Sequence, residues 1–477
     1  MILLGIGCRP RIVPRNPDAI EMFPITLFPS PFPRKEFNLA NDVQTIVNEL
    51  MHKVAFDHSF LNSSLESTVK VDSFTKNLLD INNQVEKIGS AQSVCFGLFR
   101  TDYMVDDIVS KSGLTSDGSS CDVSKRDVRD SERCRLKQVE SNAIASGFSG
   151  LAPRVGSMHR YLTAKYQADK VSLLPSNPAT HNVALSFIEA FDTYGSPSAI
   201  ILFVVEDWVV NICDQRIIEQ KITEIRPDVK VIRRKFSQLH PDGASPVKIT
   251  ENRELFIDGN EVALVYFRHC YDPDHYNHPD SWILRLQIEL SKAIKCPSIN
   301  YHLSGVKKLQ QILAKREHLE LFLAPKNCQI LLQTFTGLHG LDFETQSGDE
   351  AVKMALKWPE KFVLKPQREG GGNNLYGEEI VKVLEPIKES KEREAYILMN
   401  LIKPPIIENY LVMANAQTQS PMEIISELGI YGSILGSKNQ LIFNRKDGHL
   451  LRSKKLGVNE GGISAGFGAL DSPLLID

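Results

Sequence analysis

Residues 365–377 combine a lysine, an acid and a run of glycines, which together suit the binding of a triphosphate. The segment reads Lys-Pro-Gln-Arg-Glu-Gly-Gly-Gly-Asn-Asn-Leu-Tyr-Gly. Backbone N–H groups in such a loop can surround an anion, and Lys365 can neutralise its charge. Glu369 offers the oxygen ligand that Mg²⁺ takes. A hairpin tip is the commoner use of a glycine run, but a plain turn needs neither Lys365 nor Glu369. The segment therefore predicts a nucleotide triphosphate site with its metal.

A second candidate for metal binding lies far upstream, in residues 136–142. Their alternation predicts a strand with Gln138, Glu140 and Asn142 on one face. A carboxylate and an amide two residues apart place two oxygens side by side, which suits a magnesium ion. The same alternation also fits an ordinary solvent-facing strand, so both interpretations stay open on the pattern alone.

Charged side chains directly follow two apolar strands. Arg100 comes just after the apolar residues 94–98, and Arg268 follows residues 262–267. The ends of buried strands are common places for ligand contacts. Residues 144–151 are rich in small side chains, so this loop can bring its backbone close to a substrate.

The elements expected to position these residues divide into a helical start and alternating strands and helices. Residues 36–85 have apolar residues at helical spacing. Strands alternating with helices after residue 197 predict an α/β unit of about 100 residues. Within it we expect strands at 198–205 and 229–236, a helix at 214–225, a hairpin about Asp258-Gly259, and a helix at 281–294. Further on we expect helices at 350–358 and 378–385, the latter stopped by Pro386, and strands at 362–364, 395–402, 424–431 and 440–443.

The composition excludes several classes of protein. The chain has 477 residues, 42% of them hydrophobic, and a net charge of −3, so it lacks the basic excess that nucleic-acid binding uses. No apolar run is long enough to span a bilayer. The eight cysteines form no CxxC pair, which indicates free thiols in a reducing compartment and no zinc site. We expect a cytoplasmic protein without nucleic-acid or membrane partners.

The same patterns suggest domain boundaries. Residues 1–22 are predicted to be a poorly defined tail, whose arginines leave a transit peptide open. Residues 23–196 form the first part of the body, with a solvated insertion at 105–135. Residues 197–300 form the substrate-binding α/β domain, and residues 301–477 complete the body with a lid at about 345–420.

Seven segments, in order along the chain, resemble motifs of the eukaryotic glutathione synthetase family. They are residues 99–104, 138–142, 211–216, 305–308, 365–377, 425–429 and 451–454. A lone glycine run would be weak evidence, whereas seven ordered motifs are specific. The resemblance covers the chain from about residue 23 to its end. It implies an α/β ATP-grasp fold with an inserted substrate-binding domain and a glycine-rich lid. It further implies a magnesium-dependent homodimer that joins γ-glutamylcysteine and glycine with ATP through an acyl phosphate.

The resemblance also implies roles for individual residues. Arg100, Lys307, Lys365 and Arg452 resemble catalytic residues, and Glu140, Asn142 and Glu369 resemble the magnesium ligands. The nucleotide positions add Val363, Gly370, Gly371, Gly372, Asn373, Asn374, Tyr376, Met399, Asn400, Leu401, Ile402, Glu427, Lys454 and Glu460. The substrate positions are Arg100, Ile144, Ala145, Ser146, Gly147, Asn211, Gln215, Arg268, His269, Cys270, Tyr271, Arg452, Ile463 and Ser464.

The chain departs from the family pattern in its substrate region more than in its phosphate region. Ala145 and Gly147 stand where relatives carry serines, Cys270 is larger than usual, and Asn400 replaces a glutamate. Two alternatives therefore stay open. One is a homoglutathione-type ligase that uses β-alanine as the acceptor. The other is a non-catalytic ATP-binding protein of the ATP-grasp fold, which the presence of Lys307, Lys365 and Glu369 opposes.

Overall fold

The computed structural model describes residues 5–10, 16, 18–107, 134–413, 420–459, 462–463, 466 and 468–477. Its centre is an eight-stranded sheet in the order β18-β3-β21-β20-β19-β5-β6, with β17 paired to β19. Two 16-residue strands, β19 and β20, form its longest hairpin. The strands are β3 (Ile25–Thr26), β5 (Cys95–Asp107), β6 (Cys134–Asn142), β17 (Ile407–Asn409), β18 (Leu411–Val412), β19 (Met422–Ser437), β20 (Gln440–Lys455) and β21 (Ala469–Asp471).

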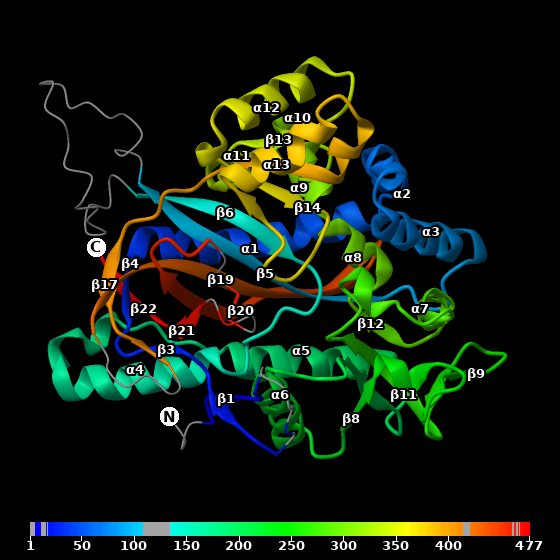
Figure 1. The fold of residues 1–477 in the computed structure, drawn as a ribbon. Helices are drawn as coiled ribbons and strands as arrows, with labels where there is room; N and C mark the ends of the chain where they lie inside the picture. Colours follow the sequence, from blue (N-terminus) through cyan, green and yellow to red (C-terminus); the bar gives the residue numbers. More distant parts are fainter. Residues whose placement is uncertain are drawn as a thin grey trace, which may run out of the picture.

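Helices cover both faces of this sheet (Figure 1). Helix α1 (Arg34–Ala55) lies on one face because Val43, Val47, Leu50 and Val54 form a buried stripe at helical spacing. Helices α4 (Ala152–Tyr166) and α5 (Ala179–Tyr194) cover the other face. A short parallel pair, β4 (Ser30–Pro33) with β22 (Pro473–Ile476), joins the two ends of the body.

The predicted α/β unit is present and has a parallel core. Strands β8 (Lys230–Lys235), β7 (Ile200–Val205), β11 (Asn260–Phe267) and β12 (Ile294–Cys296) pair in parallel, in that order. The hairpin about Asp258-Gly259 joins β10 (Leu255–Ile257) to β11, and β9 (Lys248–Ile249) extends the sheet. Helices α6 (Ile212–Ile225) and α7 (Ser281–Leu290) belong to this unit. The parallel order places the carboxyl ends of β7 and β11 side by side.

A smaller antiparallel sheet forms a separate lobe above the body (Figure 1). Its order is β13-β16-β14-β15, from Leu338–Gly340, Tyr396–Asn400, Phe362–Pro366 and Leu375–Tyr376. Helices α12 (Gln346–Lys357) and α13 (Glu378–Ile387) pack on it through a core of their own. The remaining helices are α2 (His58–Leu65), α3 (Ser73–Ile88), α8 (Ile299–Ser304), α9 (Lys307–Leu313), α10 (Arg316–Leu319) and α11 (Pro325–Thr334).

Several sequence-based boundaries were wrong. The helix predicted at 281–294 ends at Leu290, and Ile294–Cys296 pairs with β11 as a strand. The helix predicted to stop before Pro386 runs through it to Ile387. A proline in a last turn removes only one backbone hydrogen bond, so the helix tolerates it. The strands expected at 424–431 and 440–443 are parts of β19 and β20, whose bulges and glycines interrupt the apolar alternation.

The chain near its start is more ordered than the prediction of a poorly defined tail. Gly7–Cys8 pairs with Glu21–Met22 as β1 and β2, and Ile6 and Cys8 are buried. The ends of the predicted insertion, 105–107 and 134–135, continue β5 and β6 as paired strands. Its other residues, 108–133, lie outside the described residues. No helix in the described part of the chain is long and apolar enough to cross a membrane.

Candidate active site

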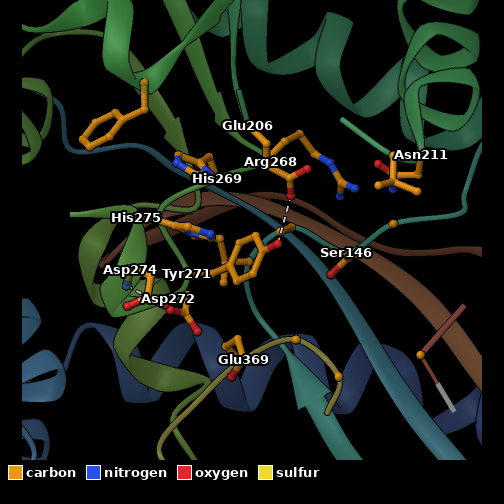
Figure 2. A pocket seen from close by; sticks show the side chains of 18 of the residues that line it. Ser146, Glu206, Asn211, Arg268, His269, Tyr271, Asp272, Asp274, His275 and Glu369 are labelled. Carbon is orange, nitrogen blue, oxygen red and sulfur yellow. Dashed lines mark hydrogen bonds between the residues drawn. The ribbon is translucent and has the colours of Figure 1, made fainter. Parts of the chain in front are cut away.

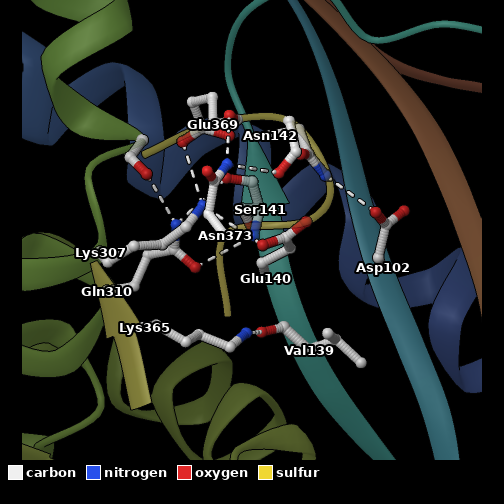
Figure 3. A network of polar contacts seen from close by, with 12 residues as sticks. Asp102, Val139, Glu140, Ser141, Asn142, Lys307, Gln310, Lys365, Glu369 and Asn373 are labelled. Carbon is white, nitrogen blue, oxygen red and sulfur yellow. Dashed lines mark hydrogen bonds and ion pairs between the residues drawn. The ribbon is translucent and has the colours of Figure 1, made fainter. Parts of the chain in front are cut away.

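Lys307 lies between two acidic residues that come from distant parts of the chain (Figure 3). Its Nζ lies 3.3 Å from Glu140 Oε2 on β6 and 3.1 Å from Glu369 Oε1 in the loop after β14. Lys307 is the first residue of α9, so the helix fixes its backbone beside β6. Only 5% of its side chain is exposed, and the values for Glu140 and Glu369 are 20% and 12%. These three residues form a shielded, charged centre between the body and the small lobe.

The two carboxyl groups differ in their electrostatic environment. Burial and the nearby charge of Glu140 raise the pKa of Glu369 to about 7, although Lys307 opposes this shift. Burial acts in the same direction on Glu140, but Lys307, Lys365, Arg452 and Arg100 outweigh it and lower its pKa to about 2. Burial opposes the charge of Lys307, yet the two carboxylates outweigh it and raise the pKa of Lys307. Glu140 is therefore the more firmly ionised of the two acids.

Lys365 on β14 and Asn142 on β6 each make hydrogen bonds to the paired strands β5 and β6. Lys365 Nζ donates to the carbonyl oxygen of Val139, 2.8 Å away, where β6 carries a bulge against β5. Asn142 Nδ2 donates to Arg100 O at 3.1 Å and to Asp102 Oδ2 at 2.9 Å. These bonds orient the Asn142 amide so that its oxygen faces away from Asp102. Glu140 and Glu369 thus present oxygen atoms to Lys307, and Asn142 lies two residues beyond Glu140 on β6.

Asp102 connects three of the predicted site residues. Arg100 Nε and Nη2 donate to its two oxygens at 2.7 and 2.8 Å, and Arg452 Nη2 lies 3.2 Å from Oδ2. Arg452 also pairs with Glu427 across the β19–β20 ladder. Asp102 is only 1% exposed, so its charge is balanced by these guanidinium groups. The sequence prediction missed it, although it follows Arg100 by two residues on the same strand.

A cavity of about 820 Å³ extends from this centre toward the α/β unit (Figure 2). Its wall brings together Arg100, Asn142, Ile144, Ala145, Ser146, Gly147, Asn211, Arg268, His269, Tyr271, Glu369, Gly370, Gly371, Asn373, Arg452 and Ile463. All of these were predicted as site residues. The cavity therefore joins the predicted phosphate-binding loop to the predicted substrate positions.

Asp214 shapes the loop at 144–151 that forms one side of the cavity. Its Oδ2 accepts the N–H of Phe148 at 2.7 Å, and its Oδ1 accepts those of Gly150 at 2.8 Å and Leu151 at 3.1 Å. Ala145 and Phe148 both have positive φ, 55° and 77°, a backbone conformation that residues other than glycine rarely adopt. The bonds to Asp214 hold this backbone against the cavity. Asp214 lies inside a recognised motif but was not singled out from the sequence.

The opposite side of the cavity is built at the carboxyl ends of β7 and β11. Arg268 follows β11 and Glu206 follows β7, and Arg268 N donates to Val204 O at 2.8 Å. Tyr271 Oη donates to Glu206 Oε1 at 2.9 Å. Burial raises the pKa of Glu206, although Arg268, Tyr271 and Arg233 lower it. Glu206 was also missed, although it directly follows an apolar strand, as Arg268 does. Arg100, expected to follow the strand at 94–98, instead lies within β5, because pairing with β19 and β6 extends that strand to Asp107.

The glycine-rich loop lies next to the substrate side of the cavity. Gly370 and Gly372 have φ of +83° and +96°, which glycine adopts without strain. A Cβ at Gly370 would lie 3.6 Å from the Tyr271 ring. Asn373 Nδ2 donates to the carbonyl oxygen of Glu369 at 3.2 Å, which ties the loop to the acid. Asn374 is half-buried in the same loop.

The predicted nucleotide positions at 363–376 and 399–402 lie on or beside the small lobe. Val363 on β14 pairs with Tyr376 on one side and with Met399 on the other. Asn400 Oδ1 lies 3.1 Å from His339 Nε2, and Leu401 N donates to Lys361 O at 2.8 Å. Ile402 is 7% exposed in the segment that follows β16. Apolar residues that include Leu313, Phe335, Leu338 and Ile397 surround Lys307 and Lys365, so an apolar recess adjoins the two lysines.

A few predicted residues lie away from the cavity wall. Gln215 Nε2 donates to Asn211 Oδ1 at 3.0 Å. It therefore contacts the cavity-lining residue Asn211 and does not line the cavity itself. The Cys270 side chain is buried in the main core, where burial raises its pKa to about 12. Lys454 donates to the carbonyl oxygen of Asn459 and lies beside Glu427 and Arg452 in a small recess. Glu460 and Ser464 lie outside the described residues.

Lysines and carboxylates held between an antiparallel lobe and a larger body define an ATP-dependent ligase of the ATP-grasp class. The fold is similar to that of a solved glutathione synthetase-like effector from Globodera pallida, with a TM-score of 0.73 and 23% identity. The match covers 100% of this chain and 94% of that one.

Sequence comparisons give the family. Residues 1–475 match the model of the eukaryotic glutathione synthase ATP-binding domain. The chain is 40% identical to glutathione synthetase of Xenopus laevis, over 100% of this chain and 94% of that protein. It is 39% identical to glutathione synthetase of Homo sapiens, over 98% of this chain and 93% of that protein. It is 37% identical to the chloroplastic glutathione synthetase of Arabidopsis thaliana, over 95% of this chain and 78% of that protein. The chain belongs to the eukaryotic glutathione synthetase family.

Proposed function

We propose that this chain joins γ-glutamylcysteine to glycine, with ATP converted to ADP and phosphate. The observation that carries this proposal is the position of Lys307 between Glu140 and Glu369, where the apolar recess beside Lys307 and Lys365 meets the 820 Å³ cavity. A carboxylate is a poor acylating agent, so the cysteinyl carboxylate first takes a phosphoryl group from ATP. The glycine amine then attacks the acyl phosphate, and phosphate leaves.

Each step has residues suited to it. Lys307 and Lys365 neutralise charge on the phosphates, and Arg100 faces the reacting carboxylate and the transferred phosphoryl group. Residues 370–374 form the lid loop that keeps water from the acyl phosphate. Arg268, Asn211 and Tyr271 bind the γ-glutamyl end. Arg452 and the segment at Ile463 bind the glycine end, a role supported by their position in the cavity wall.

Glu140, Asn142 and Glu369 are proposed to hold magnesium. Their donor set fits the ion, because all three offer hard oxygen ligands and two of them are carboxylates. The oxygens of Glu140 and Glu369 already face one cation, the Nζ of Lys307. When bound, the ion would polarise the phosphoryl oxygens. Calorimetric titration of the ATP-bound protein with Mg²⁺ tests this set, and Glu369→Gln is expected to weaken the binding.

The decisive assay measures ADP release by the purified protein. Release should require γ-glutamylcysteine and glycine together, with glutathione detected by mass spectrometry. ADP formed without either substrate, or no ADP at all, would contradict the proposal and favour a non-catalytic ATP-binding protein. Competition between glycine and β-alanine in the same assay decides the acceptor. A pocket discriminates one methylene by roughly 1–3 kcal/mol, so a clear but modest preference for glycine is expected.

Two further properties belong to the proposal. The first is a homodimer, which sedimentation of the purified protein tests through its mass. The second is a cytoplasmic location, supported by the seven cysteines of the described residues, all of which are free, as expected in a reducing compartment. Imaging of a tagged full-length chain checks the location, and accumulation in an organelle would contradict it.

A further inference from the structure

Glu206 is a half-buried carboxylate whose role the reaction described above does not explain. It lines the cavity at the carboxyl end of β7, beside Arg268 at the end of β11 (Figure 2). Its hydrogen-bond partner is Tyr271, whose Oη donates to Oε1 at 2.9 Å. Within the described residues, Glu206 forms no ion pair within 4.0 Å. Arg268 and Arg233 act on Glu206 only through their charge and lower its pKa. A half-buried carboxylate that faces a cavity without an ion pair is suited to receive a cation from a ligand.

Arg268 is the complementary group on the neighbouring strand. It is 5% exposed, and among the residues that the structure describes its Nε has no hydrogen-bond partner. Within the same residues, Nη1 makes one long contact, 3.5 Å, with Tyr266 Oη. Gly147 lies next to Arg268 Nη2. A Cβ at this position would be only 3.0 Å from Nη2, so the glycine leaves space for the guanidinium group. The guanidinium group therefore also faces the cavity with unused hydrogen-bonding capacity.

A half-buried acid and a buried arginine that share one cavity wall, without an ion pair between them, match the two charges of a zwitterion. We propose that Glu206 is the receptor for the free α-amino group of the γ-glutamyl moiety, while Arg268 binds its α-carboxylate. This assignment rests on the proposed function and adds a requirement to it. The substrate must carry an unmodified ammonium group at this end.

The alternative role for Glu206 is structural, because its bond to Tyr271 positions that ring beside Gly370 of the lid loop. The two roles predict different responses to the substrate's amine. A positioning residue would affect all ligands of the cavity alike. An ammonium receptor would affect only ligands that carry the ammonium group.

The test compares γ-glutamylcysteine with glutarylcysteine, which is identical except that hydrogen replaces the α-amino group. Equilibrium binding of both to the purified full-length protein is measured by calorimetry. A hydrogen bond to a charged group contributes enough to change affinity by roughly 10- to 100-fold. The wild type is expected to prefer γ-glutamylcysteine by that factor. Glu206→Gln keeps an acceptor for Tyr271 and is expected to reduce the preference to within about 3-fold, by weakening γ-glutamylcysteine alone.

Two variants complete the design. Glu224→Gln removes one negative charge from α6 of the same unit, where the side chain is 47% exposed and is not part of the cavity wall, and should keep the wild-type preference. Glu206→Asp retains the charge and should keep part of the preference. A preference in this variant and its loss in Glu206→Gln would show that the missing charge, and not misfolding, causes the loss.

A wild-type preference in Glu206→Gln, or equal weakening of both ligands, would overturn the assignment while leaving the proposed function intact. A wild type that neither binds nor turns over γ-glutamylcysteine would overturn the proposed function and this assignment together.

Discussion

Asp102 accepts two hydrogen bonds from Arg100, from Nε at 2.7 Å and from Nη2 at 2.8 Å. The two residues lie on β5 at the floor of the site, where Asp102 also contacts Asn142 and Arg452. One buried carboxylate thus orients an arginine proposed to face the transferred phosphoryl group and an amide proposed to bind magnesium. The catalytic geometry therefore depends on a residue that is not itself expected to touch the substrate.

Asp102→Asn should lower kcat by about 100-fold or more, because a single amide cannot accept both bonds from Arg100 and leaves its charge unbalanced. The loss of a buried ion pair should also lower the free energy of unfolding by about 3–5 kcal/mol. Steady-state kinetics and urea denaturation measure the two effects. Asp106→Asn is the matched control, because Asp106 is also buried on β5 and accepts the N–H of Lys403 at 3.0 Å. It should lose stability and keep kcat. Equal kcat in both variants would contradict a positioning role for Asp102.

Glu369→Ala should abolish turnover and leave the fold intact. Glu369 is proposed to bind the metal, and it balances the charge of Lys307, 3.1 Å away. Loss of such a group is expected to lower kcat by at least about 100-fold. A steady-state assay with excess Mg²⁺ and ATP, together with circular dichroism, measures both properties. Glu378→Ala, an exposed acid at the start of α13, should retain wild-type turnover. Activity of the Glu369 variant near that of the wild type would exclude its metal role.

Asp214→Asn should raise the KM for γ-glutamylcysteine more than the KM for ATP. Both oxygens of Asp214 accept backbone N–H groups of residues 148–151. Asparagine has one acceptor oxygen, so at least one N–H would face an NH₂ donor and the loop would leave its position. A loss of about 1–3 kcal/mol in the free energy of unfolding should accompany this change. Kinetics with each substrate varied in turn checks the separation, and equal changes in both KM values would count against it.

Acid should destabilise the folded chain as the pH falls from about 6.5 to about 4. Burial lowers the pKa of His449 to about 4, against the ordinary 6.5 that applies when the chain is unfolded. The unfolded chain therefore binds a proton that the folded chain excludes, so stability is present above pH 6.5 and lost as the pH falls toward 4. The contribution of one such histidine reaches about 3 kcal/mol. Burial also lowers the pKa of His52 to about 4, although its hydrogen bond to Ser437 opposes this shift. His52 therefore adds to the loss of stability between pH 6.5 and 4.

Urea denaturation of the wild type and of His449→Phe at several pH values isolates one histidine. The variant cannot take up the proton in either state, so its stability should change less between pH 6.5 and 4. The difference between the two slopes is the contribution of His449. Parallel slopes would show that the buried ring does not carry the acid sensitivity.

The sequence by itself determined the features that depend on local chemistry. The glycine-rich loop at 365–377, the apolar stripe of α1 and the charged residues after strands were readable because each depends on neighbours in the chain. The ordered motifs were sufficient to indicate the family, which the comparisons confirmed. Strand and helix ends were less accurate, as α7 and β12 illustrate, because pairing with β11 and not local preference decides where that segment becomes a strand.

Only the tertiary structure decided which of these groups meet. Lys307 reaches Glu140 and Glu369 because β6, α9 and the loop after β14 converge between the two lobes. Asp102 has no distinctive local pattern, and Glu206 shares the position after an apolar strand with Arg268. The contacts of both acids with specific partners appear only in the folded chain. The physical reason is that the energy of a charge depends on burial and on distances between groups, which the linear order of residues does not contain.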